Sequence, residues 1–151
     1  MELHFIAHNI RSAENVGALF RTCDSLGITR LWITGYSPTP AHSKVAKTAL
    51  GAETAVEWEQ RIDVTSVVEE LRREGTRIVA LEIAEGATNL AKYLPHQKTA
   101  LLLGNEVTGI PPSILALCDD VVAISQRGKK ESLNVAVAAG IAGFWMLHHS
   151  T

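Results

Sequence analysis

Short apolar runs alternate with amphipathic segments along the whole chain. The runs have the length and the Val, Ile and Leu content expected of strands buried in a sheet. They are Leu3–Ala7, Arg30–Thr34, Arg77–Ile83, Thr99–Leu103 and Val121–Ile124. Because helix patterns lie between these runs, the order of strand, helix and strand predicts a mostly parallel α/β sheet that is covered by helices and joined by right-handed crossovers.

The first helix is expected to begin after Ser12, which can cap it, and to end at Gly27. Its apolar residues fall on one stripe, as in a helix that packs one face against a core. This stripe consists of Val16, Leu19, Phe20 and Cys23. By the same criteria, further helices are expected over Val64–Glu74, Ser113–Leu117 and about Leu133 to His148.

The last of these helices is apolar on nearly every side, so it has to be covered all round. The large apolar residues are accompanied by small ones, including Gly140 and Gly143, which allow another backbone to approach closely. A subunit interface would provide this covering and predicts a homodimer. The alternative is a central helix inside a monomer. The apolar residues are Val135, Val137, Ala138, Ile141, Phe144, Trp145 and Leu147.

The composition favours one α/β domain over residues 1–151, with no separate RNA-binding extension. The chain has 151 residues, of which 46% are hydrophobic and only 5% aromatic, so its core should consist mainly of Ala, Val, Leu and Ile. The formal net charge of -2 argues against a protein that coats nucleic acid without specificity. It leaves room for a local basic patch.

Other sequence features indicate a cytoplasmic protein without a metal site. The amino terminus carries Glu2 and His4 and has the pattern of neither a signal peptide nor a membrane span. The cysteines are Cys23 and Cys118, which are far apart and lie in apolar stretches. We therefore expect two free thiols rather than a disulfide or a zinc site.

Three polar or glycine-rich loops follow predicted strands, where an α/β sheet offers its carboxyl edge to ligands. In the first, Asn15 lies in the first turn of a helix, and Arg21 lies off its apolar stripe. An amide and a guanidinium in this arrangement can orient a substrate, and the guanidinium can hold a phosphate with paired hydrogen bonds. The alternative is helix capping by Ser12 and Asn15, with Arg21 as a surface charge.

The second loop, Leu101–Pro111, contains one carboxylate between two glycines. Gly104 permits a close approach that a side chain would block, and Glu106 is the carboxylate. The loop matches neither the Gly-Lys-Ser/Thr of a phosphate-binding loop nor GxGxxG, so the usual nucleotide fingerprints are absent. An ordinary turn with a solvated glutamate is the alternative.

The third loop, Ile124–Asn134, leads directly into the last helix. Its cations lie near a helix start, where backbone amides already favour an anion. Together with the cations of two other segments, they could follow a short piece of RNA backbone. Each of them would otherwise be a solvated surface charge. The predicted RNA-binding residues are Arg11, Lys44, Lys47, Arg127, Lys129 and Lys130.

Three ordered motifs resemble those of the SpoU/TrmH family of SPOUT RNA methyltransferases. They are Asn15-x-Gly17-x-x-x-Arg21, then Gly104-Asn-Glu106-x-x-Gly109, then Ser132-Leu-Asn134-Val-Ala-Val-Ala-Ala-Gly140. The resemblance spans essentially the whole chain. It implies a sheet whose carboxyl-terminal segment is threaded as a deep trefoil knot, an exception to the general absence of knots. It also implies a homodimer whose cofactor pockets adjoin the interface.

The resemblance further implies that S-adenosylmethionine is the cofactor and that backbone groups hold it in the knot. The corresponding positions in this chain are Leu81, Gly104, Ile124, Ser132 and Leu133. One departure is visible, because many members have Ile-Pro-Met where this chain has Ile124-Ser125-Gln126.

The implied activity is methyl transfer to a ribose 2′-hydroxyl. The resemblance assigns catalysis to Arg21, Asn15, Glu106, Ser132 and Asn134. It implies that Arg21 assists deprotonation of the hydroxyl. Because a free arginine is too basic to be neutral at pH 7, the residue types alone support Arg21 only as a positioner of phosphate and hydroxyl.

Three other readings remain at this point. They are an RNA-binding protein with this fold but no catalysis, a base methyltransferase of another SPOUT branch, and a flavodoxin-like or phosphate-binding enzyme. The intact motif residues count against an RNA-binding protein without catalysis. The missing nucleotide fingerprints count against a flavodoxin-like or phosphate-binding enzyme. Among RNA substrates, a compact one such as tRNA is favoured over rRNA.

Overall fold

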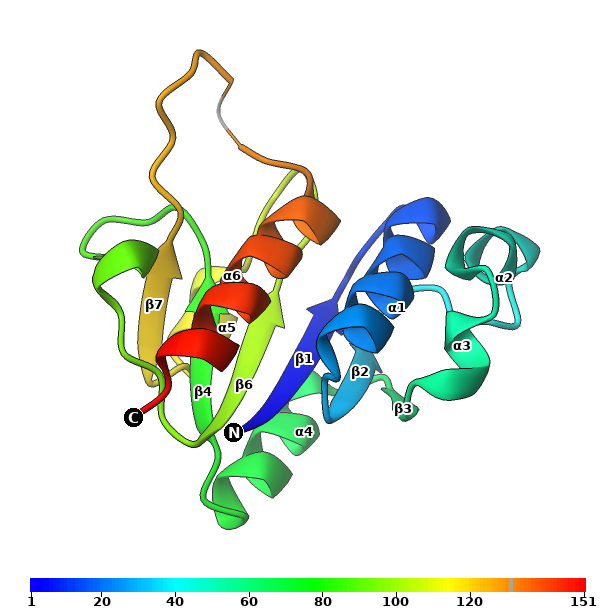
Figure 1. The fold of residues 1–151 in the computed structure, drawn as a ribbon, viewed down its shortest axis with the longest axis horizontal. Helices are drawn as coiled ribbons and strands as arrows, with labels where there is room; N and C mark the ends of the chain where they lie inside the picture. The colour runs from blue at the N-terminus through cyan, green and yellow to red at the C-terminus, as the bar shows by residue number, and fades with distance from the viewer. Residues whose placement is uncertain (131) are drawn as a thin grey trace.

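The computed structural model of the protein describes residues 1–130 and 132–151. Within these residues the chain forms one seven-stranded sheet in the order β3-β2-β1-β6-β4-β7-β5, and all neighbouring strands are parallel (Figure 1). The strands are β1 (Glu2–His8), β2 (Arg30–Thr34), β3 (Trp58–Arg61), β4 (Arg77–Leu81), β5 (Thr88–Asn89), β6 (Lys98–Leu103) and β7 (Asp120–Ala123). The expected parallel α/β sheet is confirmed.

Helices cover both faces of the sheet (Figure 1). On β1, Phe5 faces the core beneath α1 (Ala13–Leu26) and α6 (Val135–His149), whereas Ile6 faces the core beneath α4 (Val64–Arg73). This alternation follows from the two-residue period of a strand. The remaining elements are α2 (Ser43–Ala49), α3 (Ala52–Ala55), the 3-10 helix η1 (Leu90–Lys92) and α5 (Pro112–Leu115).

The expected elements exist, but several of their ends were wrong. Strand β4 ends at Leu81 instead of continuing to Ile83. The last helix begins only at Val135, because Asn134 caps it. The short strands β3 and β5 were not expected, since their sequences lack an apolar run; they lie at the two edges of the sheet.

Helix α1 begins and ends as the sequence predicts. The Ser12 hydroxyl accepts a hydrogen bond from the Asn15 amide, and Gly27 ends the helix with a φ of 66°. Helix α2 packs closely on α1 at Gly17, where a Cβ atom would lie 2.6 Å from the Cβ of Thr48 and 2.8 Å from the carbonyl oxygen of Val45. Gly17 is thus required for contact between the two helices.

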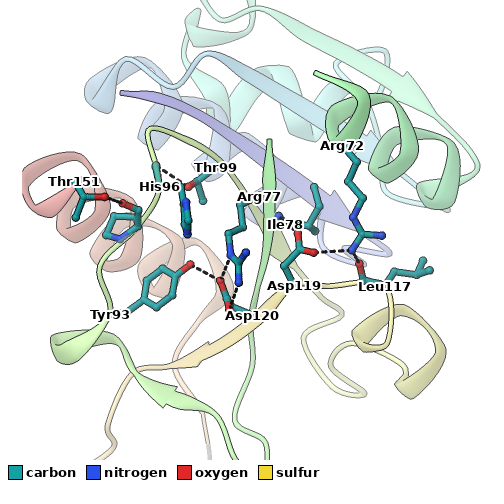
Figure 2. Close-up of polar contacts among 11 residues, drawn as sticks. Arg72, Arg77, Ile78, Tyr93, His96, Thr99, Leu117, Asp119, Asp120 and Thr151 are labelled. Carbon is teal, nitrogen blue, oxygen red and sulfur yellow. Dashed lines mark hydrogen bonds and ion pairs between the residues drawn. The ribbon is translucent and has the colours of Figure 1, made fainter. Parts of the chain in front are cut away.

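Polar side chains tie the sheet together at its amino-terminal end (Figure 2). Arg77, the first residue of β4, donates two hydrogen bonds to Asp120, the first residue of β7, at 2.6 and 2.9 Å. The Tyr93 hydroxyl donates to the same carboxylate at 2.8 Å. The Arg77 hydrogen bonds hold the pKa of Asp120 below its ordinary value, so this carboxylate is ionised at neutral pH.

Helix α6 is buried along one side only. Ala136, Ala139 and Met146 are in the core, whereas Val137, Ile141 and Phe144 are 51%, 43% and 56% exposed. A position at the centre of the monomer is therefore wrong for this helix. Among the helices of the described residues, none has the length and apolar character needed to cross a membrane.

Replacing Gly17 by Ala should lower the free energy of unfolding by about 1–3 kcal/mol, because the added methyl group overlaps α2. Glu69→Ala, at an exposed position of α4, is the control and should change the free energy of unfolding by no more than about 0.5 kcal/mol. Urea unfolding measures both variants, and equal stabilities would contradict the close packing of α1 on α2.

Candidate active site

A cleft of about 650 Å³ lies at the carboxyl ends of β4, β6 and β7. This is the edge where open α/β sheets bind ligands. The lining contains apolar side chains and the loops that follow the three strands. The five residues assigned to the cofactor all line this cleft, namely Leu81, Gly104, Ile124, Ser132 and Leu133.

The loop after β6 is closed by its own backbone. Asn105 and Gly109 exchange two backbone hydrogen bonds of 3.2 and 2.9 Å. A Cβ atom on Gly104 would lie 2.5 Å from the Ile110 side chain, so the glycine is needed for packing within the chain. The predicted close approach at Gly104 therefore exists, and its partner is the returning end of the same loop.

Glu82 is a residue of the cleft that the sequence analysis missed. Its carboxylate accepts hydrogen bonds from the backbone amides of Ile83 at 3.0 Å and Ile110 at 2.7 Å. A Cβ on Gly109 would lie 2.3 Å from the same carboxylate. Glu82 thus joins the end of β4 to the loop after β6. Because the strand was expected to continue to Ile83, Glu82 was treated as part of it.

The Glu106 carboxylate connects the first two sequence motifs. It accepts hydrogen bonds from the backbone amides of Arg11 and Ser12, each at 2.8 Å, and from the Asn15 side chain at 3.0 Å. The side-chain amide of Asn134 donates to Asn15 Oδ1 at 2.9 Å. Residues from all three motifs, up to 119 positions apart in sequence, therefore form one hydrogen-bonded network.

The hydrogen bonds to Glu106 also fix its charge. Partial burial on its own would raise the pKa of this carboxyl group, but the amides of Arg11, Ser12 and Asn15 together hold the pKa below its ordinary value. The carboxylate is therefore ionised at neutral pH and can act only as an acceptor. As a result, the Asn15 side chain must present its NH₂ group to Glu106 and its oxygen to Asn134.

Two of the predicted catalytic residues occupy the start of α6. Asn134 caps the helix, because its side-chain oxygen accepts hydrogen bonds from the amides of Ala136 and Val137. Its NH₂ group remains available for Asn15. Ser132 is exposed and lines the cleft. The capping expected of Asn134 and its contact with the site are thus compatible.

Arg21 is exposed on α1 and is not among the described residues that line the cleft. It follows Asn15 by six positions, which corresponds to about 9 Å along a helix. The structure therefore brings Asn15, Glu106, Ser132 and Asn134 to one place and leaves Arg21 outside it.

The predicted RNA-binding residues fall into two groups. Arg11 and Lys44 line a second hollow together with His42, and Glu106 lies between this hollow and the cleft. Lys47 is exposed on α2, three positions after Lys44. The second group lies in residues 126–130, an exposed segment after β7 that projects from the sheet (Figure 1), and consists of Arg127, Lys129 and Lys130.

The chain is similar to known RNA methyltransferases. It is 29% identical over 141 residues to a tRNA (guanosine(18)-2′-O)-methyltransferase of Aquifex aeolicus, a match that covers 93% of this chain and 66% of the relative. A structure of an AdoMet-bound rRNA methyltransferase from Sinorhizobium meliloti superposes with a TM-score of 0.91 and 25% identity, over 98% of this chain and 56% of that one. The chain thus spans less than two thirds of the length of these proteins.

Another solved structure, which concerns the 2-OH methylation of C/U34 on tRNA, has nearly the same extent. Its TM-score is 0.88 at 26% identity, and the match covers 98% of this chain and 95% of that one. The model of the SpoU rRNA Methylase family matches residues 2–144. This range includes every residue of the Asn15, Glu106 and Asn134 network and all three loops of the cleft, and the chain belongs to the SpoU rRNA Methylase family.

Proposed function

We propose that this chain transfers a methyl group from S-adenosylmethionine to a ribose 2′-hydroxyl of RNA. The observation that carries the proposal is the hydrogen-bonded network of Glu106, Asn15 and Asn134, which joins the three family motifs at the rim of one cleft. The names of the similar proteins, which include tRNA and rRNA 2′-O-methyltransferases, support the same reaction.

The residues of the cleft fit S-adenosylmethionine. A volume of about 650 Å³ is in the range of sites that enclose a molecule of this size. Leu81, Ile124 and Leu133 offer apolar surface, and the ends of three parallel strands offer backbone groups. When bound, the cofactor supplies a methyl group that its sulfonium has already activated. The chemistry calls for no metal.

Asn15 is the residue that we assign to orienting the 2′-hydroxyl. Both ends of its side-chain amide are fixed, because Glu106 accepts from the NH₂ group and Asn134 donates to the oxygen. One N–H and one lone pair remain for a substrate. A preorganised group of this kind needs no rearrangement as the reaction proceeds. Glu106 acts through Asn15 and is therefore a positioning residue.

Arg21 is assigned to the phosphate and to the proton of the hydroxyl. Methyl transfer forms an O–CH₃ bond on the ribose oxygen, which has to lose its proton. Negative charge builds up on this oxygen as the proton leaves. The guanidinium stabilises that charge and can hold an adjacent RNA phosphate with paired hydrogen bonds. Because this guanidinium is already protonated, the proton itself passes to water, and Arg21 assists its loss by stabilising the negative charge on the oxygen.

A homodimer would reconcile this assignment with the exposed position of Arg21. The apolar face of α6, formed by Val137, Ile141 and Phe144, is exposed in the single chain. Helix α1 lies directly beside α6 (Figure 1). A second copy that covers this face would also come close to Arg21. We therefore propose that Arg21 serves the cleft of the partner subunit.

We also propose that residues 1–151 act as a single methyltransferase domain with a trefoil knot near the carboxyl terminus. After β7 the chain runs back to α6, which packs against α1. The cleft is lined by the loops that follow β4, β6 and β7. The resemblance to the SpoU/TrmH family supports the knot.

The substrate that we propose is tRNA. The match to the structure concerned with the 2-OH methylation of C/U34 on tRNA extends over 95% of that chain, which supports nucleotide 34 of tRNA as the target. Cations on both sides of Glu106 could follow the RNA backbone from α2 to the loop before α6. They are Arg11, Lys44, Lys47, Arg127, Lys129 and Lys130.

Incubation with radiolabelled S-adenosylmethionine and unmodified tRNA in the presence of a metal chelator should yield a nucleotide whose 3′ linkage resists alkaline hydrolysis. Asn15→Ala should lower the rate at least about a hundredfold, as expected when a positioning group is lost. Calorimetry should give the wild-type protein and the Asn15→Ala variant the same affinity for S-adenosylmethionine. Glu69→Ala, at an exposed position of α4 on the other face of the sheet, is the control and should retain the activity. An alkali-labile product would point to base methylation and reject the proposal.

Arg21→Ala should change the free energy of unfolding by no more than about 0.5 kcal/mol, because the side chain is exposed. Methyl transfer should nevertheless fall at least about a hundredfold. Arg21→Lys should restore little of it, since an ammonium cannot make the planar paired contact. Near-normal transfer by the alanine variant would return Arg21 to an ordinary surface charge.

Co-refolding an equal mixture of the Arg21→Ala and Asn15→Ala proteins tests whether Arg21 serves the cleft of the partner subunit. In a symmetric dimer, random exchange should restore about a quarter of the active clefts, because each mixed dimer contains one intact combination. If Arg21 acted within its own chain, every cleft would lack one residue and the mixture would stay inactive. A monomeric mass in light scattering at micromolar concentration would overturn the dimer itself.

A further inference from the structure

Tyr36 is a large aromatic residue that stands exposed beside the proposed active site. It follows β2 by two positions, at the same edge of the sheet as the cleft, and 63% of it is accessible to solvent. The hydrogen-bonded network of Glu106, Asn15 and Asn134 does not include it. The structure nevertheless fixes its hydroxyl group and its backbone.

Three strand ends converge on Tyr36. The Asn105 side-chain NH₂ group, after β6, donates to the Tyr36 hydroxyl at 2.8 Å and to the Asn9 carbonyl oxygen, after β1, at 3.0 Å. The side-chain oxygen of Asn9 accepts from the Tyr36 backbone amide at 3.1 Å. The ring is thus held at both of its ends while its surface remains open.

This arrangement requires unusual backbone conformations. Asn9 has a φ of 54°, which is uncommon for a residue with a side chain, and Gly35 has a φ of 62°. A Cβ at Gly35 would lie 1.8 Å from Asn9 Oδ1, so only glycine fits before Tyr36. The buried Ser37 anchors the following position through hydrogen bonds with Ala7 and Ile10. Such conformations concentrate at functional sites.

The surroundings of the ring suit RNA. Asn105, which holds the hydroxyl, lies between Gly104 and Glu106 and lines the cleft. Glu106 in turn borders the hollow lined by Arg11 and Lys44. Tyr36 and this cationic hollow therefore lie at the same edge of the sheet. Proteins bind unpaired nucleotides with such a combination, in which the ring stacks on a base and the cations contact the phosphates.

We propose that Tyr36 stacks on an unpaired nucleobase of the RNA, next to the nucleotide whose ribose is methylated. The proposal rests on the proposed function, because it concerns how the same site holds its substrate. The hydrogen bond from Asn105 sets the orientation of the ring relative to the cleft. Stacking is tolerant of base identity, so Tyr36 contributes affinity and position rather than a choice of base.

Binding of fluorescein-labelled unfractionated tRNA, followed by fluorescence anisotropy, tests this directly. Tyr36→Phe keeps the ring and should bind within about threefold of the wild type, whereas Tyr36→Ala should bind roughly tenfold more weakly, as expected for the loss of one stacked base. Tyr36→Leu keeps apolar surface without an aromatic face and should resemble the alanine variant. Leu94→Ala removes another exposed apolar side chain, away from the strand ends that form the cleft, and should bind like the wild type.

The kinetics should separate stacking from a structural role. Loss of a contact made equally in the ground and transition states raises KM for tRNA and leaves kcat little changed. Unchanged tRNA affinity in Tyr36→Ala, or full binding by Tyr36→Leu, would overturn the stacking proposal. A wild-type protein that binds tRNA through Tyr36 but fails to bind S-adenosylmethionine in calorimetry would instead overturn the methyltransferase proposal and leave standing only the stacking of Tyr36 on RNA.

Discussion

The site depends on one ionised carboxylate, that of Glu106. It accepts hydrogen bonds from the amides of Arg11 and Ser12, directly before α1, and from the Asn15 side chain in the first turn of that helix. Charge-assisted hydrogen bonds of this kind are stronger than neutral ones, and a partly buried carboxylate left without them would destabilise the fold. The loop after β6 and the start of α1 therefore hold each other in place. Asn134 joins the pair through Asn15, which ties the start of α6 to the same point.

The glycines of the motifs are needed for close packing within the protein more than for contact with a ligand. Gly17 lets α2 approach α1, Gly104 makes room for Ile110, and Gly109 makes room for the Glu82 carboxylate. Each glycine removes a side chain where two segments of the chain meet at less than an ordinary contact distance. The cleft is what remains between segments packed in this way. Its shape is thus set by contacts within the protein.

The sequence predicted the parallel sheet and the capped first helix, because strand periodicity and helix capping are local signals. The family resemblance, and no local signal, grouped Asn15, Glu106, Ser132 and Asn134 with Arg21, and the structure brings all of these except Arg21 together. The sequence did not predict the edge strands β3 and β5, because these are short and their sequences contain no apolar run. Glu82 and Tyr36 were missed for a different reason. Their importance comes from partners in distant segments, Ile110 and Asn105, and a pattern along the chain carries no signal for such pairs.

The two ends of the sheet differ in how their polar groups are used. At the amino end, Asp120 receives hydrogen bonds from Arg77 and Tyr93, so the polar atoms there serve the fold (Figure 2). At the carboxyl end, Asn15 keeps hydrogen-bonding capacity to spare, and Tyr36 keeps its ring exposed. The hydrogen bonds at the amino end stabilise the fold. The carboxyl edge can therefore hold polar groups without full hydrogen bonding, or residues in strained backbone conformations, at no loss of the folded state. This difference supports the proposal that the carboxyl edge binds the substrate and the cofactor.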